Sequence, residues 1–362
     1  MTRPVSVLIV DDSITARSLM TVALRQDPQI HVVGTAATAL EARDMIIKLQ
    51  PDVLTLDVEM PQMNGLEFLE KIMRLRPMPV IMVSSHTARG ADVAIRALEL
   101  GAVECFAKPQ GFPAALPYQG LCALVRHAAS ARIRGKGVDD RPLAPAVNAT
   151  PMRDPPLVAI GASTGGVEAL TEVLGSYPAD CPPTVITQHM PAAFTDGFAR
   201  RLDRLCAPNV RIAEDLMPVK RGQVLIAPGG AHHLQAVRRN GVLMARLYAA
   251  DPVNGHRPSV DVLFQSVAHH VGRHAIGVIL TGMEYDGARG LLAMRQAGAR
   301  TLGQDEESSV IYGMPKAAFD LGAVERQLPL DRIAGGILRL AGQLSEGTPS
   351  TRSIIATPET LA

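Results

Sequence analysis

The first 134 residues alternate between short runs of consecutive apolar residues and longer segments in which apolar residues recur every three or four positions. Unbroken apolar runs are typical of strands buried on both faces, and the recurring pattern indicates helices. Strands that alternate with helices predict a five-stranded, doubly wound, parallel α/β domain. We expect strands at 5–10, 31–36, 53–56, 80–83 and 103–107, and helices at 13–25, 39–49, 66–75, 91–100 and 116–133.

A proline-rich segment at 135–156 has no periodic apolar face and favours neither helix nor strand. It predicts a linker between a first domain at 1–134 and a second, larger domain at 157–344. The remaining residues, 345–362, are rich in Ser, Thr and Pro. This composition predicts a disordered tail.

The alternation resumes after the linker and predicts a second doubly wound parallel sheet. Turn residues Asn240 and Gly241 precede the apolar run 242–247, which favours an antiparallel hairpin there. The expected strands are 158–160, 184–187, 223–226 and 276–280, and the expected helices are 167–174, 194–205, 260–270 and 288–296.

Composition and charge narrow the function classes. The 362 residues are 47% apolar, and 36 basic against 35 acidic residues leave a net charge of +1, so nucleic-acid binding is not expected. The N-terminus lacks a signal-peptide pattern, and no apolar stretch reaches the ~18 residues of a membrane span, so no membrane insertion is expected. Four cysteines without Cys-x-x-Cys spacing are typical of reduced thiols, which predicts a cytoplasmic protein.

Three carboxylates follow strands of the first predicted sheet: Asp11 and Asp12 after the first strand, and Asp57 after the third. Ligands of open parallel sheets bind at the carboxyl ends of the strands, and clustered carboxylates favour Mg²⁺. Ser84 and Lys108 follow the fourth and fifth strands, where a hydroxyl and an ammonium can bind phosphoryl oxygens. Each acid alone fits a helix cap or a solvated strand end. Their joint placement predicts a phosphoryl-accepting site.

The segment 5–134 resembles the response-regulator receiver domain. Receivers often carry an aromatic residue three positions before the lysine, and here Cys105 occupies that position, so no aromatic relay from Asp57 is expected. The dipeptides that add to the resemblance are Met60-Pro61, Asn64-Gly65 and Lys108-Pro109.

The receiver resemblance implies a role for each residue of the carboxylate cluster. Asp57 is implied to be the phosphoacceptor, and Ser84 and Lys108 are implied to contact the phosphoryl group. The implied Mg²⁺ ligands are Asp11, Asp12, Asp57 and the backbone carbonyl of Glu59.

The second domain opens with an apolar strand that leads into Ser163 and the pair Gly165-Gly166. A strand-to-helix turn exposes the serine hydroxyl beside free backbone N–H groups, but the hydroxyl needs an adjacent base to act as a nucleophile. His189 follows the next strand, and Asp286 lies just past the strand 276–280, where it could orient the imidazole. These strand ends predict a serine, histidine and aspartate triad.

The same glycine turn could instead cradle the phosphates of a nucleotide. It lacks Gly-x-Gly-x-x-Gly spacing, and Gln188-His189 stands where an acidic residue should hold the ribose. Nucleotide binding is therefore the weaker hypothesis.

Segment 157–344 resembles the catalytic domain of the chemotaxis protein-glutamate methylesterase family, in which a receiver precedes the catalytic domain. The resemblance implies that Ser163 is the nucleophile, His189 the general base and acid, and Asp286 the orienting acid. The backbone N–H groups near Thr164 and Met283 are candidate oxyanion donors. The family motif Thr-Gly-Met-Gly-x-Asp-Gly has Glu284 in place of its second glycine here. The segments that carry the resemblance are 226–229, 256–264 and 281–287.

The resemblance implies a serine esterase of two-component signalling that hydrolyses glutamate γ-methyl esters on methyl-accepting chemotaxis receptors. It also implies deamidation of receptor glutamines and activation when the chemotaxis histidine kinase phosphorylates the receiver. Hydrolysis by a triad requires no metal. Two alternatives stay open: a second domain that only binds a partner, and a serine hydrolase of other esters or peptides.

Overall fold

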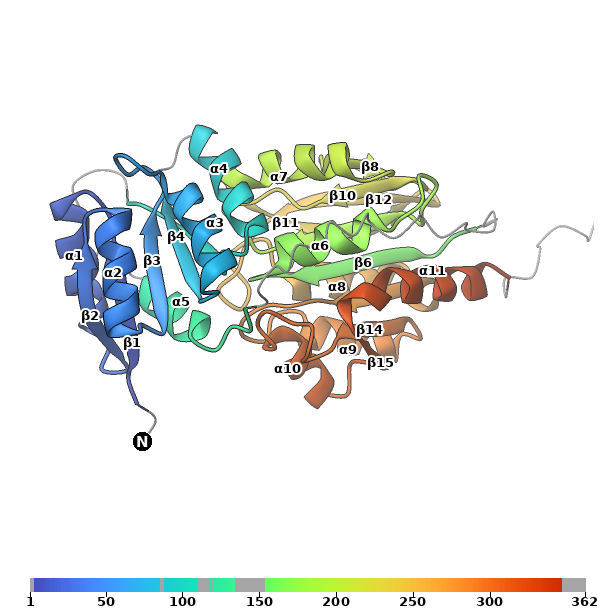
Figure 1. Cartoon of the computed structure of the whole chain (residues 1–362). Coiled ribbons are helices and arrows are strands. Elements are labelled where there is room, and N and C mark those ends of the chain that lie inside the picture. The colour runs from blue at the N-terminus through green and yellow to red at the C-terminus, as the bar shows by residue number, and fades with distance from the viewer. Residues whose placement is uncertain (1–2, 85–87, 110–117, 119, 134–153, 347–362) are drawn as a thin grey trace, which may run out of the picture.

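The computed structural model describes residues 3–84, 88–109, 118, 120–133 and 154–346 (Figure 1). Most of the predicted linker and the residues after Glu346 lie outside these ranges, so the predicted domain limits stay predictions. All four cysteines are free thiols. Within the described ranges, no helix has the length and apolar character needed to cross a membrane.

The first sheet has five parallel strands in the order β2-β1-β3-β4-β5, which confirms the predicted architecture. Each strand lies within one or two residues of its expected position. The three central runs are buried on both faces, whereas the edge strands β2 and β5 are partly exposed. The strands are β1 (Val5–Val10), β2 (Ile30–Ala36), β3 (Val53–Asp57), β4 (Val80–Ser84) and β5 (Glu104–Ala107).

Five helices accompany this sheet, and four of them match the expected segments closely. The fifth is shorter than predicted because residues 129–133 leave the helix, where the Arg132 N–H donates to the Val310 carbonyl of the second domain at 3.1 Å. The helices are α1 (Ile14–Leu24), α2 (Ala39–Leu49), α3 (Gly65–Leu75), α4 (Ala88–Glu99) and α5 (Leu121–Ala128).

The second sheet has seven parallel strands in the order β15-β14-β13-β6-β7-β10-β8, with β6 at its centre. The four predicted strands are confirmed. The prediction missed β8, β14 and β15, which carry polar residues and lack an unbroken apolar run. The strands are β6 (Leu157–Ala162), β7 (Thr184–Gln188), β8 (Asn209–Ile212), β10 (Gln223–Ile226), β13 (Ala275–Ile279), β14 (Arg300–Gln304) and β15 (Arg326–Leu328).

The four helices predicted in the second domain are confirmed, and α10 and α11 add to them. The predicted hairpin is also present, because β11 pairs antiparallel with β12, and β9 pairs along β12. The helices are α6 (Gly166–Gly175), α7 (Ala192–Leu205), α8 (Val260–His270), α9 (Ala288–Gln296), α10 (Met314–Asp320) and α11 (Leu330–Glu346), with a short 3-10 turn η1 (Gly272–His274). The antiparallel strands are β9 (Met217–Pro218), β11 (His232–Arg239) and β12 (Val242–Ala249).

The first domain packs against the carboxyl edge of the second sheet, and α4 lies beside α7 (Figure 1). Ile95 of α4 belongs to the hydrophobic core of the second domain, and Phe194 of α7 belongs to a core of the first. Arg201 forms an ion pair with Glu99 across this boundary. The two domains therefore share apolar packing beside the end of β6.

Candidate active site

Ser163 lies one residue past β6, in the turn that leads into α6. Its N–H donates to the Thr281 carbonyl at 3.0 Å, which ties the turn to the segment after β13. Gly165 has φ of +78°, a left-handed conformation that glycine adopts without the steric cost of a side chain. The serine side chain therefore stands at the junction of strand and helix, as the sequence predicts.

His189 lies directly after β7, and its N–H donates to the Ala162 carbonyl at 3.0 Å. Its Nε2 lies 2.9 Å from Oδ2 of Asp286. A carboxylate at this distance assigns the proton to Nε2 and leaves the Nδ1 lone pair available as a base. Nδ1 is buried and makes no hydrogen bond to any described residue. The imidazole is thus oriented from one side and open to a proton on the other.

Asp286 is fully buried and accepts hydrogen bonds from four groups besides His189. Burial alone would raise the pKa of Asp286, but the bonds from His189, Asn254 and Val260 lower it to about 2. The donors include the first turn of α8, whose N–H groups and helix dipole favour a negative charge. These donors are Asn254 Nδ2 at 2.8 Å, Ser259 Oγ at 2.8 Å, the Val260 N–H at 2.7 Å and the Asp261 N–H at 3.3 Å.

Burial is the main influence on His189 and lowers its pKa, while the hydrogen bond that His189 donates to Asp286 acts in the opposite direction. The imidazole is therefore neutral near pH 7. A neutral imidazole is the form that can take a proton from a serine hydroxyl.

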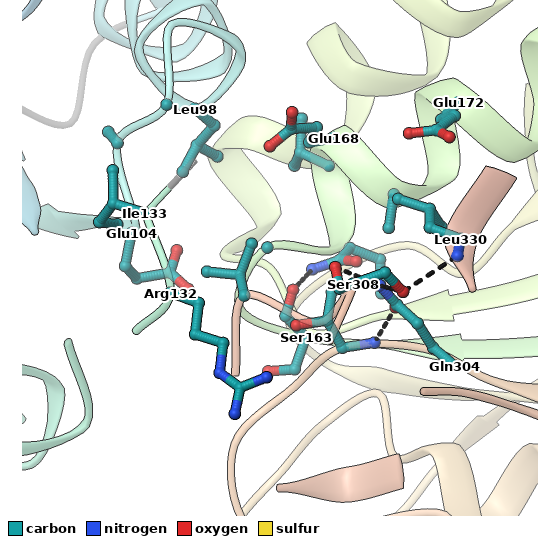
Figure 2. Close-up of a pocket in the computed structure, with 18 of the residues that line it drawn as sticks. Leu98, Glu104, Arg132, Ile133, Ser163, Glu168, Glu172, Gln304, Ser308 and Leu330 are labelled. Atoms are coloured by element: carbon teal, nitrogen blue, oxygen red, sulfur yellow. Dashed lines mark hydrogen bonds between the residues drawn. The ribbon is translucent and has the colours of Figure 1, made fainter. Parts of the chain in front are cut away.

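Ser163 and His189 line one cavity of about 90 Å³, and no hydrogen bond between their side chains is present within the described residues. Figure 2 shows Ser163 in this cavity with Gln304 and Ser308 on its side, and with Glu104 and Arg132 of the first domain nearby. The structure thus brings all three predicted triad residues together. The serine must still rotate or shift to reach Nδ1, and active-site hydrogen bonds are often long before substrate binds.

The candidate oxyanion donors flank the serine. Among the described residues, neither the Thr164 N–H nor the Met283 N–H donates a hydrogen bond, so both are available to an incoming oxygen. Gly282 approaches the serine so closely that a Cβ placed there would lie 2.8 Å from the Cβ of Ser163. The chain near Met283 therefore passes directly beside the nucleophile.

The sequence prediction missed a turn that supports this site. Val253 and His256 exchange backbone hydrogen bonds of 3.0 Å around Asn254 and Gly255, whose φ values are +53° and +79°. An Asn-Gly pair flanked by such bonds is a recognisable turn signal. The turn brings Asn254 to Asp286 and places the ring of His256 against His189.

The predicted carboxylate cluster of the first domain is present at the carboxyl edge of its sheet. Asp11 and Asp57 are buried and Asp12 is exposed, and one oxygen from each lies within 4.8 Å of the others. Lys108 Nζ lies 2.9 Å from both Asp11 and Asp57. Ser84 is buried at the end of β4. Three carboxylates at this spacing form a donor set that fits a hard divalent cation.

Asp57 sits in a different electrostatic setting from Asp286. Burial raises the pKa of Asp57 to about 6, although the Lys108 ammonium and a hydrogen bond from the Glu59 backbone oppose the shift. Burial alone would lower the pKa of Lys108, but its bonds to Asp11 and Asp57 raise it. Gly65, of the Asn64-Gly65 pair, packs against the backbone of Asp57 so closely that a Cβ there would lie 2.0 Å from the Asp57 carbonyl oxygen.

A contact across the domain boundary reaches the turn that carries Ser163. Thr164 Oγ1, next to the serine, donates to Oε2 of Glu104 on β5 at 2.9 Å. Burial raises the pKa of Glu104, and hydrogen bonds from Cys105 and Thr164 partly offset this. Arg132 also pairs with Glu306 at 2.8 Å. The first domain therefore contacts the residue that neighbours the candidate nucleophile.

Known proteins resemble the chain over both domains. The family profile described as CheB methylesterase matches residues 158–337, and the response regulator receiver domain profile matches residues 7–116. A Gluconobacter oxydans relative named protein-glutamate methylesterase/protein-glutamine glutaminase is 56% identical over 348 residues, which are 95% of this chain and 97% of the relative. A Caulobacter vibrioides relative named protein-glutamate methylesterase/protein-glutamine glutaminase 1 is 57% identical over 340 residues, 93% of this chain and 98% of the relative.

Among solved structures, the Thermotoga maritima CheB methylesterase catalytic domain is similar to the second domain. Its TM-score is 0.50 at 37% sequence identity, and the match covers 51% of this chain and 98% of that one.

Proposed function

The chain belongs to the protein-glutamate methylesterase/protein-glutamine glutaminase family, and from that premise we propose how its own residues carry out the reaction. It is a hydrolase of protein glutamate methyl esters in chemotaxis, with a receiver domain that places the reaction under phosphorylation control. The relatives favour this function over a second domain that only binds a partner and over a hydrolase of unrelated esters. The substrates we propose are methyl-accepting chemotaxis receptors, and the phosphoryl source is a histidine kinase.

Ser163, His189 and Asp286 are the proposed catalytic triad. The observation that carries this proposal is the 2.9 Å contact from His189 Nε2 to Asp286, which leaves Nδ1 without a partner in a residue that lines the same cavity as Ser163. A base oriented by a buried carboxylate and placed beside a hydroxyl is the arrangement that serine hydrolases require.

The proposed reaction has two halves. Ser163 Oγ attacks the ester carbonyl while Nδ1 of His189 takes the hydroxyl proton, and the Thr164 and Met283 N–H groups bind the developing oxyanion. His189 then gives that proton to the departing methoxide, which leaves as methanol. A water molecule, deprotonated by His189, attacks the glutamyl ester and releases glutamate and free Ser163. With a glutamine substrate, ammonia is the leaving group and the other steps are the same.

Methanol release from membranes that carry methylated receptors tests this triad. Ser163→Ala is expected to lower the rate by about 10³-fold or more, because the remaining site keeps only binding and oxyanion contacts. Ser176→Ala, at the end of α6 and outside the site, is the matched control and should keep the parent rate. A Ser163→Ala protein with the parent rate would rule out the assignment.

Asp57 is the proposed phosphoacceptor, with Ser84 and Lys108 in contact with the phosphoryl oxygens. Asp11, Asp12, Asp57 and the Glu59 carbonyl are the proposed ligands of Mg²⁺, and the spacing of the three carboxylates supports this set. Bound there, Mg²⁺ supplies positive charge to the phosphoryl oxygens during transfer. A carboxylate oxygen of Asp57 attacks phosphorus while the bond from phosphorus to the imidazole nitrogen of the kinase histidine breaks, and Lys108 neutralises charge beside the transferred group.

We further propose that the unphosphorylated receiver blocks access to Ser163. The cavity beside the serine is about 90 Å³, whereas sites for small ligands are typically about 300–1,000 Å³. Glu104 and Arg132 of the receiver close one side of it (Figure 2). A receptor helix therefore needs the domains to separate before its ester reaches the serine, and phosphorylation of Asp57 would favour the separated state.

A further inference from the structure

A second imidazole lies flat on the candidate catalytic histidine. The rings of His256 and His189 are nearly parallel at 7°, with their centroids 3.7 Å apart. His256 reaches this position from the turn at 253–256, whose Asn254 also binds Asp286. The turn therefore contacts both members of the His189–Asp286 pair, and His256 covers one face of the imidazole.

Glu284, in the segment after β13, contacts the ring of His256. Its Oε2 lies 3.3 Å from Nε2 of His256. Glu284 follows the candidate oxyanion residue Met283 and has φ of +61°, a backbone conformation that costs free energy for any residue with a side chain. A strained non-glycine residue beside a reactive centre is a common sign of a functional constraint.

We propose that Glu284 and His256 form a second carboxylate–imidazole pair, stacked on the His189–Asp286 pair, in which Glu284 is a positioning residue for His189. The proposal rests on the proposed role of His189 as general base. Glu284 holds the ring of His256, and His256 restricts the tilt of His189, so that Nδ1 stays aimed into the cavity beside Ser163.

The second pair also has an electrostatic effect on the reaction. When His189 takes the serine proton it becomes an imidazolium, and the negative charge of Glu284 favours that cation. Burial is the largest influence on His189 and lowers its pKa; His256 lowers the pKa further, and Glu284 raises it. Glu284 thus opposes the lowering of the His189 pKa by the stacked ring of His256.

Other charged groups near His189 stay constant in the experiment below. Asp286 is bonded to it directly, and none of the proposed substitutions touches that bond. The charged side chains that line the same cavity are Glu104, Arg132, Glu168 and Glu172.

The test uses the full chain with Glu284→Gln, which keeps the side-chain shape and removes the charge. Two quantities are measured: the pH dependence of kcat/KM for methanol release, and the NMR titration of the His189 ring in histidine-labelled protein, assigned with His189→Gln. Both the acidic limb of the rate and the ring titration should move to lower pH by about 0.2–0.7 pH unit. The plateau rate should fall about two- to fivefold with little change in KM. Glu214→Gln, which removes one exposed charge in the segment after β8, is the matched control and should match the parent.

His256→Phe shows whether the effect passes through the stacked ring. Phenylalanine keeps a flat ring on His189 and removes the nitrogen that Glu284 contacts, so Glu284→Gln should have a smaller effect in this background. Superposable profiles and ring titrations for Glu284→Gln and the parent would overturn the proposal. Undiminished methanol release by His189→Gln would instead overturn the proposed triad, and the ring titration would still test the second pair.

Discussion

Asp57 and Asp286 are both buried aspartates at the carboxyl edge of a parallel sheet, yet their surroundings shift their pKa values in opposite directions. Burial dominates at Asp57 and raises its pKa to about 6, against the pull of Lys108. At Asp286 burial is outweighed by donors from His189, Asn254 and Val260, and the pKa falls to about 2. The same residue type in the same kind of location thus has two different affinities for a proton.

The difference follows from the number of hydrogen-bond donors around each carboxylate. Asp286 accepts from five groups, including the first turn of α8, and these bonds fix both its charge and its geometry. Asp57 shares Lys108 with Asp11 and has a like charge nearby. A carboxylate that is incompletely satisfied can accept a phosphoryl group and a cation, whereas a fully satisfied one serves as a fixed support.

The largest expected effect comes from Asp286→Asn. The amide cannot accept hydrogen bonds from His189 and from all the other donors of Asp286. The imidazole then no longer has a fixed tautomer or orientation, and the esterase rate should fall about 10⁴-fold. The free energy of unfolding at pH 7 should fall by about 2–4 kcal/mol, since buried donors are left unpaired. Methanol release and urea unfolding measure the two effects. Asp196→Asn on the exposed face of α7 is the control; equal stability of Asp286→Asn and the parent would contradict the role of Asp286 as a structural support.

Asp57→Asn should have the opposite effect on stability. A folded-state pKa raised above the usual 3.8 contributes stability that is present below pH 3.8 and is lost as the pH rises through about 6. In Mg²⁺-free buffer at pH 8, Asp57→Asn should therefore be more stable than the parent by about 1–3 kcal/mol, with the gain disappearing near pH 4. The same variant should lose all activation by a small phosphodonor. A destabilised Asp57→Asn protein at pH 8 would show that Lys108 satisfies the carboxylate fully.

Glu104→Ala tests the hydrogen bond that joins the two domains beside Ser163. Loss of its hydrogen bond with Thr164 should favour the separated domains and raise the basal esterase rate about fivefold without phosphodonor. Burial raises the pKa of Glu104, so ionisation of this carboxyl as the pH rises should favour separation of the two domains in the parent. The basal rate of the parent should therefore increase more steeply with pH than that of Glu104→Gln. Glu99→Gln, which weakens a different ion pair of the same boundary, shows how much any boundary contact contributes. An unchanged basal rate for Glu104→Ala would show that the hydrogen bond between Glu104 and Thr164 does not hold the domains together.

The smallest expected effect is on stability at Glu284. Glycine adopts φ of +61° without steric cost, so Glu284→Gly should raise the free energy of unfolding by about 1 kcal/mol while the plateau esterase rate falls. Thermal unfolding of the full chain measures the gain. A less stable Glu284→Gly protein would mean that the contact with His256 outweighs the backbone strain.

The sequence predicts most of the fold because buried parallel strands are unbroken apolar runs. β14 and β15 escape prediction because neither contains an unbroken apolar run, and their pairing depends on a neighbouring strand rather than on local sequence. Strand ends also locate Ser163, His189 and Asp286. The support of Asp286 by Asn254 and Ser259, and the choice of Nδ1 as the free nitrogen, depend on packing between distant segments and cannot be derived from spacing.

Asp286 caps the first turn of α8 and also accepts a hydrogen bond from His189, so one carboxylate supports the start of a helix and the proposed catalytic site. The proposed triad is therefore complete only when β6, β7, β13 and α8 have all assembled, across more than a hundred residues of chain. A chain still emerging from the ribosome, or one opened locally at α8, would carry Ser163 without the support that Asp286 gives to its proposed base.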